Sequence, residues 1–305
     1  MAASDDSAVQ TAKEVVKATS VHEATGGTLL EGPTFGGDGR LYFVDVMAPA
    51  GEAKVLALDL ESRNVAEVFT DGASAFTSAQ FGHDDRLYLT DIASGSVLSL
   101  EADGSDPQTV FTGEVEGSVV LPDDLAFDGD GSMFVTDTRG MQDPGWQAPG
   151  RVIRIDSDGV ASVLARDLPS PNGISFDEQG DGLWVAQYNA NRLDYYALNE
   201  DRTAVKEAYP GIYVDAGRAR VDSTAVDSDG NIYQAFHGLA QINVYSNDGK
   251  LIQIIEVPGE NLESATNVAI RPGSTEGYIT VSGSAGGYIY SFDALGEGTR
   301  QSNGG

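Results

Sequence analysis

Cysteine is absent from the 305 residues, and lysine and histidine are scarce. Without cysteine, the chain can form no disulfide, thiolate nucleophile or thiolate metal site. The 18 basic residues stand against 47 acidic ones, which gives a formal net charge of -29. A field of this sign repels phosphate, so neither nucleic acid nor an anionic membrane is an expected partner.

The acidic, lysine-poor composition also suits a protein that stays soluble at high salt, because salt screens the repulsion between exposed charges. A halophilic or marine source is one hypothesis, and an ordinary acidic surface is the other. The N-terminal residues lack the basic start and apolar core of a secretory signal, and no apolar run approaches the ~20 residues that cross a bilayer. These absences predict a cytoplasmic protein.

Six segments of the chain share one pattern, in which an apolar anchor precedes a turn rich in Asp and Gly and then a hydrophobic pair. The equivalent second-strand residues lie 46, 46, 50, 49 and 46 positions apart, at Tyr42, Tyr88, Phe134, Trp184, Tyr233 and Ile279. Such a period, with four short strands per unit, is typical of β-propeller blades. The sequence therefore predicts an all-β fold, a six-bladed β-propeller with four antiparallel strands per blade.

The sixth unit has sequence for only three strands, since the residues after Asp293 are typical of a loop. An alternating segment near the N-terminus, residues 17–25, is expected to supply the missing outer strand and to close the ring. The predicted organisation is an N-terminal extension over residues 1–16, one propeller domain over 17–294 and a flexible C-terminal tail over 295–305.

The position four residues before each anchor forms a column across the repeats, made of Glu31, Thr77, Asp123, Asn172, Asp222 and Thr266. In a propeller, such residues surround one mouth of the central channel. Carboxylates that share a site repel one another unless something compensates them. Oxygen donors without His or Cys favour a hard cation, Ca²⁺ ahead of Mg²⁺ or Mn²⁺, and Ser223 adds a hydroxyl beside the column. The alternative is that these polar residues only line a wet channel.

Loops that follow the second strands surround the same mouth and are expected to contact a substrate. The longest runs from Thr138 to Gly150 and could act as a lid. The candidate substrate-binding residues in these loops and in the column are Thr77, Arg139, Met141, Trp146, Tyr188, Phe236 and His237. Met47 is a further candidate for an apolar wall. The apolar members could instead pack the lid, and His237 could be an ordinary loop histidine.

Four inner-strand stretches carry a resemblance to a known family: EGPTF, PDDLAFD, SPNGISFD and VDSTAVDSDGNIY. They are similar to the corresponding motifs of the senescence marker protein, gluconolactonase and luciferin-regenerating-enzyme family. The stretches DDLAFDGDGSMFVTDTRG, NANRL and DSTAVDSDGNIYQAFHG are most similar to its drug-responsive lactonase branch. The resemblance runs from about Gly26 to Gly259.

The resemblance implies a six-bladed propeller whose channel holds a catalytic divalent cation, usually calcium, on a Glu, an Asn and an Asp. Those positions match Glu31, Asn172 and Asp222, while Asp123 and Ser223 match residues of the lactonase branch.

The same comparison of motifs suggests one further site and shows one departure from the family. The branch resembles a group with a second, structural calcium, for which Glu114, Glu116 and Ser118 are weak candidates here. A basic residue of the gluconolactonases is replaced by Leu121, which argues against a sugar-acid lactone as substrate.

The implied activity is calcium-dependent hydrolysis of the ester bond of a lactone. In this hypothesis the cation polarises the carbonyl, and Asp222 or Asp123 takes a proton from the attacking water, with Asp222 favoured. Two rivals stay open: a calcium-dependent phosphotriesterase that resembles diisopropyl fluorophosphatase, and a non-enzymatic binding propeller that resembles the NHL-repeat proteins. The expected partner is a small-molecule lactone or ester, and the expected state is a monomer or a dimer.

Overall fold

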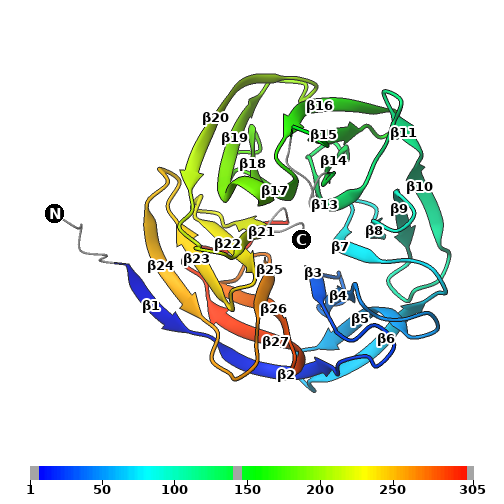
Figure 1. The fold of residues 1–305 in the computed structure, drawn as a ribbon, viewed down its shortest axis with the longest axis vertical. Helices are drawn as coiled ribbons and strands as arrows, with labels where there is room; N and C mark the ends of the chain where they lie inside the picture. Colours follow the sequence, from blue (N-terminus) through cyan, green and yellow to red (C-terminus); the bar gives the residue numbers. More distant parts are fainter. Residues whose placement is uncertain (1–6, 140–145, 301–305) are drawn as a thin grey trace.

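The alternation of apolar strands and Asp-Gly turns folds into six sheets that stand like blades around one axis (Figure 1). The computed structural model describes residues 7–139 and 146–300. In each blade, four strands run antiparallel from the centre of the ring to its rim. The predicted six-bladed β-propeller is therefore confirmed.

The strands of the blades follow one order from the axis outward. The inner strands are β3 (Leu30–Phe35), β7 (Phe76–Phe81), β13 (Pro122–Phe127), β17 (Pro171–Phe176), β21 (Arg220–Val226) and β25 (Ser264–Ile270). The second strands are β4 (Leu41–Asp45), β8 (Leu87–Asp91), β14 (Met133–Asp137), β18 (Gly182–Gln187), β22 (Ile232–His237) and β26 (Glu276–Gly283). The third strands are β5 (Ala53–Asp59), β9 (Ser96–Leu100), β15 (Gly150–Ile155), β19 (Arg192–Leu198), β23 (Gln241–Tyr245) and β27 (Gly286–Asp293).

The outer strands complete the blades: β6 (Asn64–Thr70), β10 (Gln108–Thr112), β16 (Ala161–Leu168), β20 (Val205–Tyr213), β24 (Leu251–Glu256) and β2 (Lys13–Thr19). A hairpin of β11 (Glu114–Val115) and β12 (Ser118–Val119), the strand β1 (Ala8–Thr11) and the 3-10 helix η1 (Tyr188–Ala190) lie outside this pattern. Within the described residues, no helix has the length and apolar character needed to cross a bilayer.

Aromatic rings join neighbouring blades at the predicted anchor positions. The second residue of each pair is the apolar anchor at the end of an inner strand, and its ring packs edge-on against a ring of the preceding blade. The pairs are Tyr278–Phe35, Tyr42–Phe81, Tyr88–Phe127 and Phe134–Phe176. Each such pair contributes about 0.5–1.5 kcal/mol beyond the area that it buries. The hydrophobic core is divided into clusters that each span two neighbouring blades, so the inner strands are held firmly from both sides.

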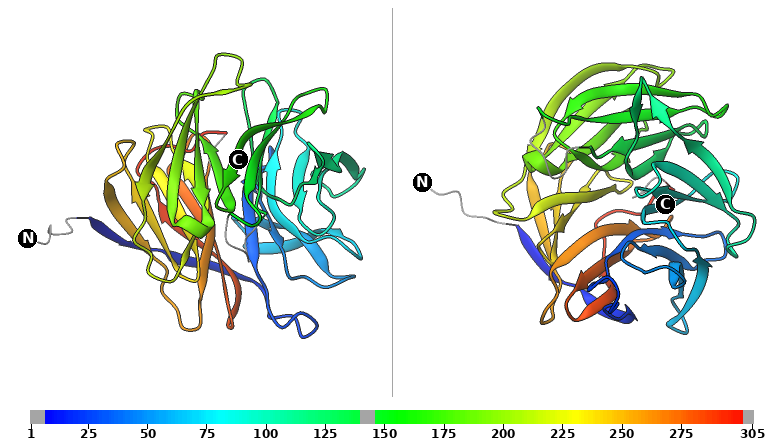
Figure 2. Two further views of the ribbon diagram at one scale, coloured as in Figure 1. Left: turned by 45° about the horizontal axis from the view of Figure 1, so that its top comes forward. Right: turned by 45° about the vertical axis from the view of Figure 1, so that its right-hand side comes forward.

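The N-terminal segment closes the ring. β2 pairs antiparallel with β27 and completes the sixth blade, while β1 adds a parallel strand to β24 in the fifth, and both run along the outside of the ring (Figure 2). The predicted closure by an N-terminal strand is confirmed, but the strand spans Lys13–Thr19 rather than residues 17–25. Residues after Thr19 turn over the first blade instead, because His22 bonds the buried carboxylate of Asp45 at 2.8 Å. The predicted domain boundary at residue 17 is therefore too late.

The C-terminal segment after β27 crosses the turns between inner and second strands. The backbone N–H of Gly296 donates to Asp227 Oδ2 at 2.8 Å, and Arg300 Nη2 reaches the carbonyl of Gly82 in the second blade at 2.6 Å. The predicted flexible tail is therefore wrong as far as Arg300, because the polar groups of the turns bind its backbone. The residues after Arg300 lie outside the described part of the chain.

Asp227 fastens this segment to the fifth blade. Its fully buried carboxylate accepts hydrogen bonds from Asn231 N, Tyr233 Oη and Gly296 N. Asp227→Ala should lower the free energy of unfolding by about 2–4 kcal/mol, because several buried donors lose their acceptor. Urea unfolding measures the loss, and Asp229→Ala, at an exposed position of the same turn, is the matched control. Equal losses in the two variants would contradict this role.

Candidate active site

Every inner strand carries a β-bulge at the same height. The register against the second strand shifts beside each column residue, at Glu31, Thr77, Asp123, Asn172, Asp222 and Thr266. A bulge sets two residues of one strand against one residue of its partner and re-aims their side chains. Two consecutive side chains of an inner strand can therefore reach across to neighbouring blades, and they form an upper and a lower tier.

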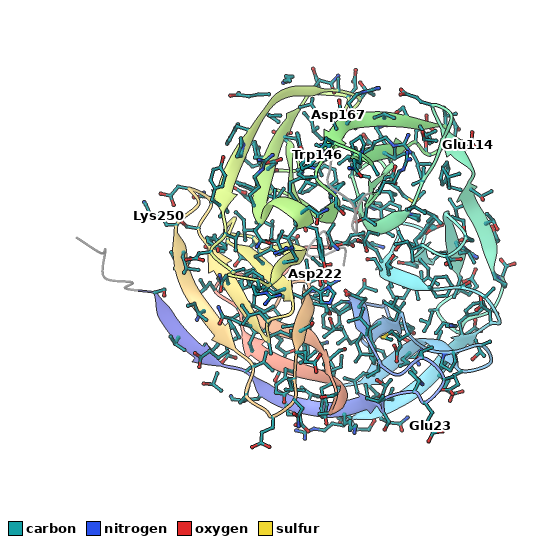
Figure 3. The ribbon with its side chains drawn as sticks, in the orientation of Figure 1. Glu23, Glu114, Trp146, Asp167, Asp222 and Lys250 are labelled. Carbon is teal, nitrogen blue, oxygen red and sulfur yellow. The ribbon has the colours of Figure 1, made fainter. Side chains whose placement is uncertain are left out.

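The upper tier gathers four predicted site residues at one mouth of the channel. Glu31, Asp123, Asn172 and Asp222 are 7%, 8%, 5% and 5% exposed. Asn172 Nδ2 donates to Asp123 Oδ2 at 2.8 Å, and the carboxamide also opposes the rise in the pKa of Asp222. Asp222 lies beside the centre of the ring (Figure 3). The structure thus brings the predicted carboxylates and the carboxamide together.

Apart from Ser223, the residues of the lower tier were missed by the sequence analysis. Ser78 Oγ donates to Asp124 Oδ1 at 2.6 Å, and Asn267 Nδ2 donates to Ser223 Oγ at 2.9 Å. Ser223 opposes the rise in the pKa of Asp124, and Asn267 opposes the rise in the pKa of Glu31, so the two tiers interact. The available signal was the residue after each column position, which is glycine or polar in every blade: Gly32, Ser78, Asp124, Gly173, Ser223 and Asn267.

The two threonines of the column hold the backbone beside the acids. Thr77 Oγ1 donates to the carbonyl of Asp123 at 2.9 Å, from the second blade to the third. Thr266 Oγ1 donates to the carbonyl of Leu30, next to Glu31, at 2.6 Å, from the sixth blade to the first. Thr77 was predicted to bind substrate, but its hydroxyl is engaged in positioning Asp123.

Glycine in the lower tier lets adjacent inner strands approach one another. A Cβ atom on Gly173 would lie 2.7 Å from Ser223 Cα, and one on Gly32 would lie 2.3 Å from Ala79 N. Real Cβ atoms do not come this close to backbone, so these positions exclude a side chain. The close approach at Gly173 places Asn172 within reach of the carboxylates on both sides of it.

Burial raises the pKa of all four carboxyl groups of the two tiers, and repulsion from neighbouring carboxylates adds to the rise for Glu31, Asp123 and Asp222. Burial is the largest cause in each case. Burial, with repulsion from Asp124, raises the pKa of Asp123 to about 7, and burial raises that of Asp124 to about 6. Burial and the neighbouring carboxylates also raise the pKa values of Glu31 and Asp222 well above their ordinary range. In the described part of the chain, no cationic side chain is among the main causes that set these values.

The donor set fits a hard divalent cation. Carboxylates and a carboxamide offer oxygen, which is the ligand atom that Ca²⁺ prefers. Among the described residues, Asp124 Oδ2 is buried without a hydrogen-bond partner, and no neighbouring base compensates the repulsion in the upper tier. Over residues 7–139 and 146–300, no three acidic or imidazole groups already converge on one point, and the amide of Asn172 donates to Asp123 among them.

Tyr188 and His237 form a pair at the rim of the same mouth. Tyr188 Oη lies 3.0 Å from His237 Nδ1. Burial raises the pKa of Tyr188, and the charges of Asp222 and Asp123 add to the shift, so the hydroxyl is within electrostatic reach of the upper tier. Phe236, in contrast, is fully buried in the core between the fourth and fifth blades. It packs the core rather than a substrate wall.

The predicted lid loop is described only at its ends. Arg139 follows β14 and is half-buried, and its charge opposes the rise that burial causes in the pKa of Asp137. Trp146 is 85% exposed and labelled in Figure 3. Met141 lies outside the described residues. Neither Arg139 nor Trp146 has a contact with the column in the described part of the chain that would place it on a substrate.

The hairpin β11–β12 lies at the outer rim, where Figure 3 labels Glu114 far from Asp222. The carboxylate of Glu116 accepts hydrogen bonds from Arg166 Nη1 and Nη2 at 3.1 and 3.2 Å. The carbonyl of Ser118 accepts from the guanidinium of Arg151. Guanidinium groups thus already bind two of the three weak candidates for a structural calcium site, which disfavours that site.

Comparison with known proteins finds similar sequences over most of the chain. The sequence model of the SMP-30/Gluconolactonase/LRE-like region matches residues 29–283. A lactonase drp35 of Staphylococcus saprophyticus is 28% identical over 285 residues, covering 89% of this chain and 85% of the relative. A lactonase drp35 of Staphylococcus aureus is 27% identical over 259 residues, covering 82% and 77%.

Solved structures share the fold at lower identity. A gluconolactonase from Xanthomonas campestris superposes with a TM-score of 0.72 at 20% identity, covering 92% of this chain and 97% of the other. A calcium-binding regucalcin from Agrobacterium tumefaciens superposes with a TM-score of 0.74 at 16% identity, covering 96% and 99%. At these identities the superpositions show the propeller fold.

The raised pKa values predict how stability depends on pH in chelator-treated protein. The folded pKa values of Asp123 and Asp124, about 7 and about 6, lie above those of an unfolded aspartate, about 3.9. Between these limits the folded state binds more protons than the unfolded state, so stability is fully present below about pH 4 and is lost as the pH rises through 7. The loss should be of the order of a few kcal/mol.

Melting temperatures between pH 5 and pH 8 test this dependence. The metal-free protein should melt at progressively lower temperature as the pH rises, and Asp124→Asn should flatten the slope by removing one buried charge. Asp103→Asn, at an exposed position whose pKa is lowered by hydrogen bonds with Ser105, is the matched control. A slope unchanged by Asp124→Asn would show that the lower tier does not titrate in this range.

Proposed function

The chain belongs to the SMP-30/gluconolactonase/LRE-like family, and we propose that it is a calcium-dependent lactonase. The observation that carries the proposal is the upper tier, where Glu31, Asp123, Asn172 and Asp222 lie buried at one channel mouth and no base among the described residues compensates their charge. Lactonases among the curated relatives support the reaction class. Glu31, Asp123, Asn172 and Asp222 would hold the ion, and Ser223 would support it from the lower tier.

The chemistry of the reaction assigns a task to each residue. Hydrolysis adds water to the carbonyl carbon of the lactone and breaks its bond to the ring oxygen. When bound, calcium would polarise the carbonyl oxygen and stabilise the negative charge that develops on it. Asp222 takes a proton from the attacking water and returns it to the departing ring oxygen, which leaves a hydroxy acid. Asn172 fixes the orientation of Asp123, because its carboxamide donates to Asp123 Oδ2, and it also opposes the rise in the pKa of Asp222.

The charge of the protein bears on the substrate. A net charge of -29 and a mouth lined by carboxylates disfavour an anionic lactone. Leu121 lies beside β13, where the side chain is partly exposed and offers no cation to a sugar acid. An uncharged lactone is the substrate class that fits these features.

A panel of lactones tests the activity. Protein stripped with EDTA is assayed on dihydrocoumarin, gluconolactone and γ-butyrolactone, and on diisopropyl fluorophosphate, before and after addition of Ca²⁺, Mg²⁺ or Mn²⁺. Hydrolysis of the uncharged lactones should be at least tenfold faster after Ca²⁺, with gluconolactone the poorest substrate. Hydrolysis of the fluorophosphate alone would replace the lactonase proposal with a phosphotriesterase, and activity that EDTA leaves unchanged would contradict calcium dependence.

Removal of the proposed base tests the mechanism. Asp222→Ala should reduce kcat on the best lactone by about 100-fold or more, which is the range for loss of a general base. Asp103→Asn removes one acid from an exposed site and should keep the activity of the parent protein. Melting temperatures of both variants report folding. Turnover by a folded Asp222→Ala protein at the parent rate would remove Asp222 from this role.

A further inference from the structure

A hollow opens beside the mouth of the channel that the carboxylates line, over the fifth, sixth and first blades. It has a volume of about 530 Å³ and is lined on one side by Val21, Leu29 and Met47 and on the other by His237, Glu263 and Ser264. We propose that this hollow is a subsite for an uncharged aliphatic substituent on the lactone ring, an inference that rests on the proposed lactonase activity. Its volume lies within the range of about 300–1,000 Å³ of small-molecule pockets.

The strands place the hollow one step above the column. Leu29 and Ser264 each precede a column residue, Glu31 and Thr266, by two positions. His237 pairs with Arg220, which precedes Asp222 by two positions. Two residues of extended strand span about 7 Å, so the floor of the hollow meets the rim of the upper tier.

The pair of Tyr188 and His237 links the two spaces. The charge of Asp222 adds to the rise that burial causes in the pKa of Tyr188, and the Tyr188 hydroxyl contacts the His237 ring that lines the hollow. A lactone whose carbonyl lies at the carboxylates can therefore direct a substituent past this pair. The burial that lowers the pKa of His237 keeps its ring neutral at pH 7, which suits an uncharged neighbour.

The apolar wall of the hollow is built in advance of any ligand. Asp45, which is fully buried, accepts hydrogen bonds from Thr28 Oγ1, Leu29 N and Met47 N at 2.7, 3.0 and 3.1 Å. Thr25 Oγ1 adds a bond to the carbonyl of Met47 at 2.8 Å. A wall fixed in this way binds a substituent without an ordering cost of its own.

The opposite wall sets the chemical class. Glu263 contributes a carboxylate, and the hydroxyl oxygens of Ser264 and Ser282 already accept the N–H groups of Gly238 and Leu30 at 2.9 Å. No lysine or arginine is among the residues that line the hollow in the described part of the chain. An anionic substituent is therefore disfavoured, while an alkyl chain can pack against Val21, Leu29 and Met47.

A series of γ-lactones tests the subsite, from γ-butyrolactone through members with alkyl substituents of one to six carbons. In the parent protein, kcat/KM should rise by up to about fourfold for each methylene that is buried. Met47→Trp fills the hollow and should lower the ratio of kcat/KM between the longest and the shortest lactone by at least tenfold. Val119→Trp, at an exposed position of the outer hairpin, should keep the ratio of the parent protein.

The outcomes separate the two proposals. Hydrolysis of the series with no dependence on chain length, or a dependence that Met47→Trp leaves unchanged, would overturn the subsite while the lactonase activity stands. Hydrolysis of no lactone by the calcium-loaded parent protein would overturn both. Glu263→Gln provides a second measurement. It should raise kcat/KM at least threefold for a lactone that carries a carboxylate on its side chain. An unchanged kcat/KM would show that Glu263 does not exclude anionic substituents from the hollow.

Discussion

Mutual repulsion among buried carboxylates is the constraint on which the rest of this structure depends. Glu31, Asp123, Asp124 and Asp222 are withdrawn from water, and burial raises the pKa of each, while repulsion from a neighbouring carboxylate adds to the rise for Glu31, Asp123 and Asp222. Such a cluster opposes folding unless its side chains are held in place and their negative charge is compensated. The hydrogen bonds of Asn172, Asn267, Ser78 and Ser223 hold the site in place, and a cation is suited to compensate the charge.

The fold supplies the rigidity that this arrangement requires. The bulge at one height of every inner strand turns two successive side chains inward, and the core clusters between blades keep the inner strands from spreading. The threonines of the second and sixth blades then tie the backbone of their neighbours beside Asp123 and Glu31. The propeller thus serves the site by fixing strands that are distant in sequence, rather than by providing a surface for it.

Some of this architecture could be read from the sequence, and some could not. The spacing of the anchors predicts the blades, and the column four residues before them predicts the upper tier, because both patterns recur in every repeat of the sequence. The lower tier depends on a bulge, and regular strand alternation would turn Asp124 and Asn267 away from the channel. Phe236 was predicted to contact substrate at the mouth for a related reason. Its position near the end of a strand does not determine on which face of the sheet its side chain lies.

The ends of the chain were harder to predict, because no repeat restates them. The N-terminal residues are mostly polar, and Lys13–Thr19 form a strand because the free edge of β27 offers hydrogen bonds to them. The glycine-rich segment after β27 has the composition of a disordered tail, yet Asp227 and the neighbouring turns bind its backbone. In both places a partner far away in the sequence decides the structure.

That distance has a consequence for how the protein is made. Lys13 pairs with Ser291, so the strand that completes the last blade is synthesised long before the strand with which it pairs. Until that partner has been made, the chain carries an unpaired strand and an open ring, both of which invite association with other chains. Completing the propeller thus requires the closing of a very long loop, and the rate of that step sets how long the unpaired strand edges are exposed.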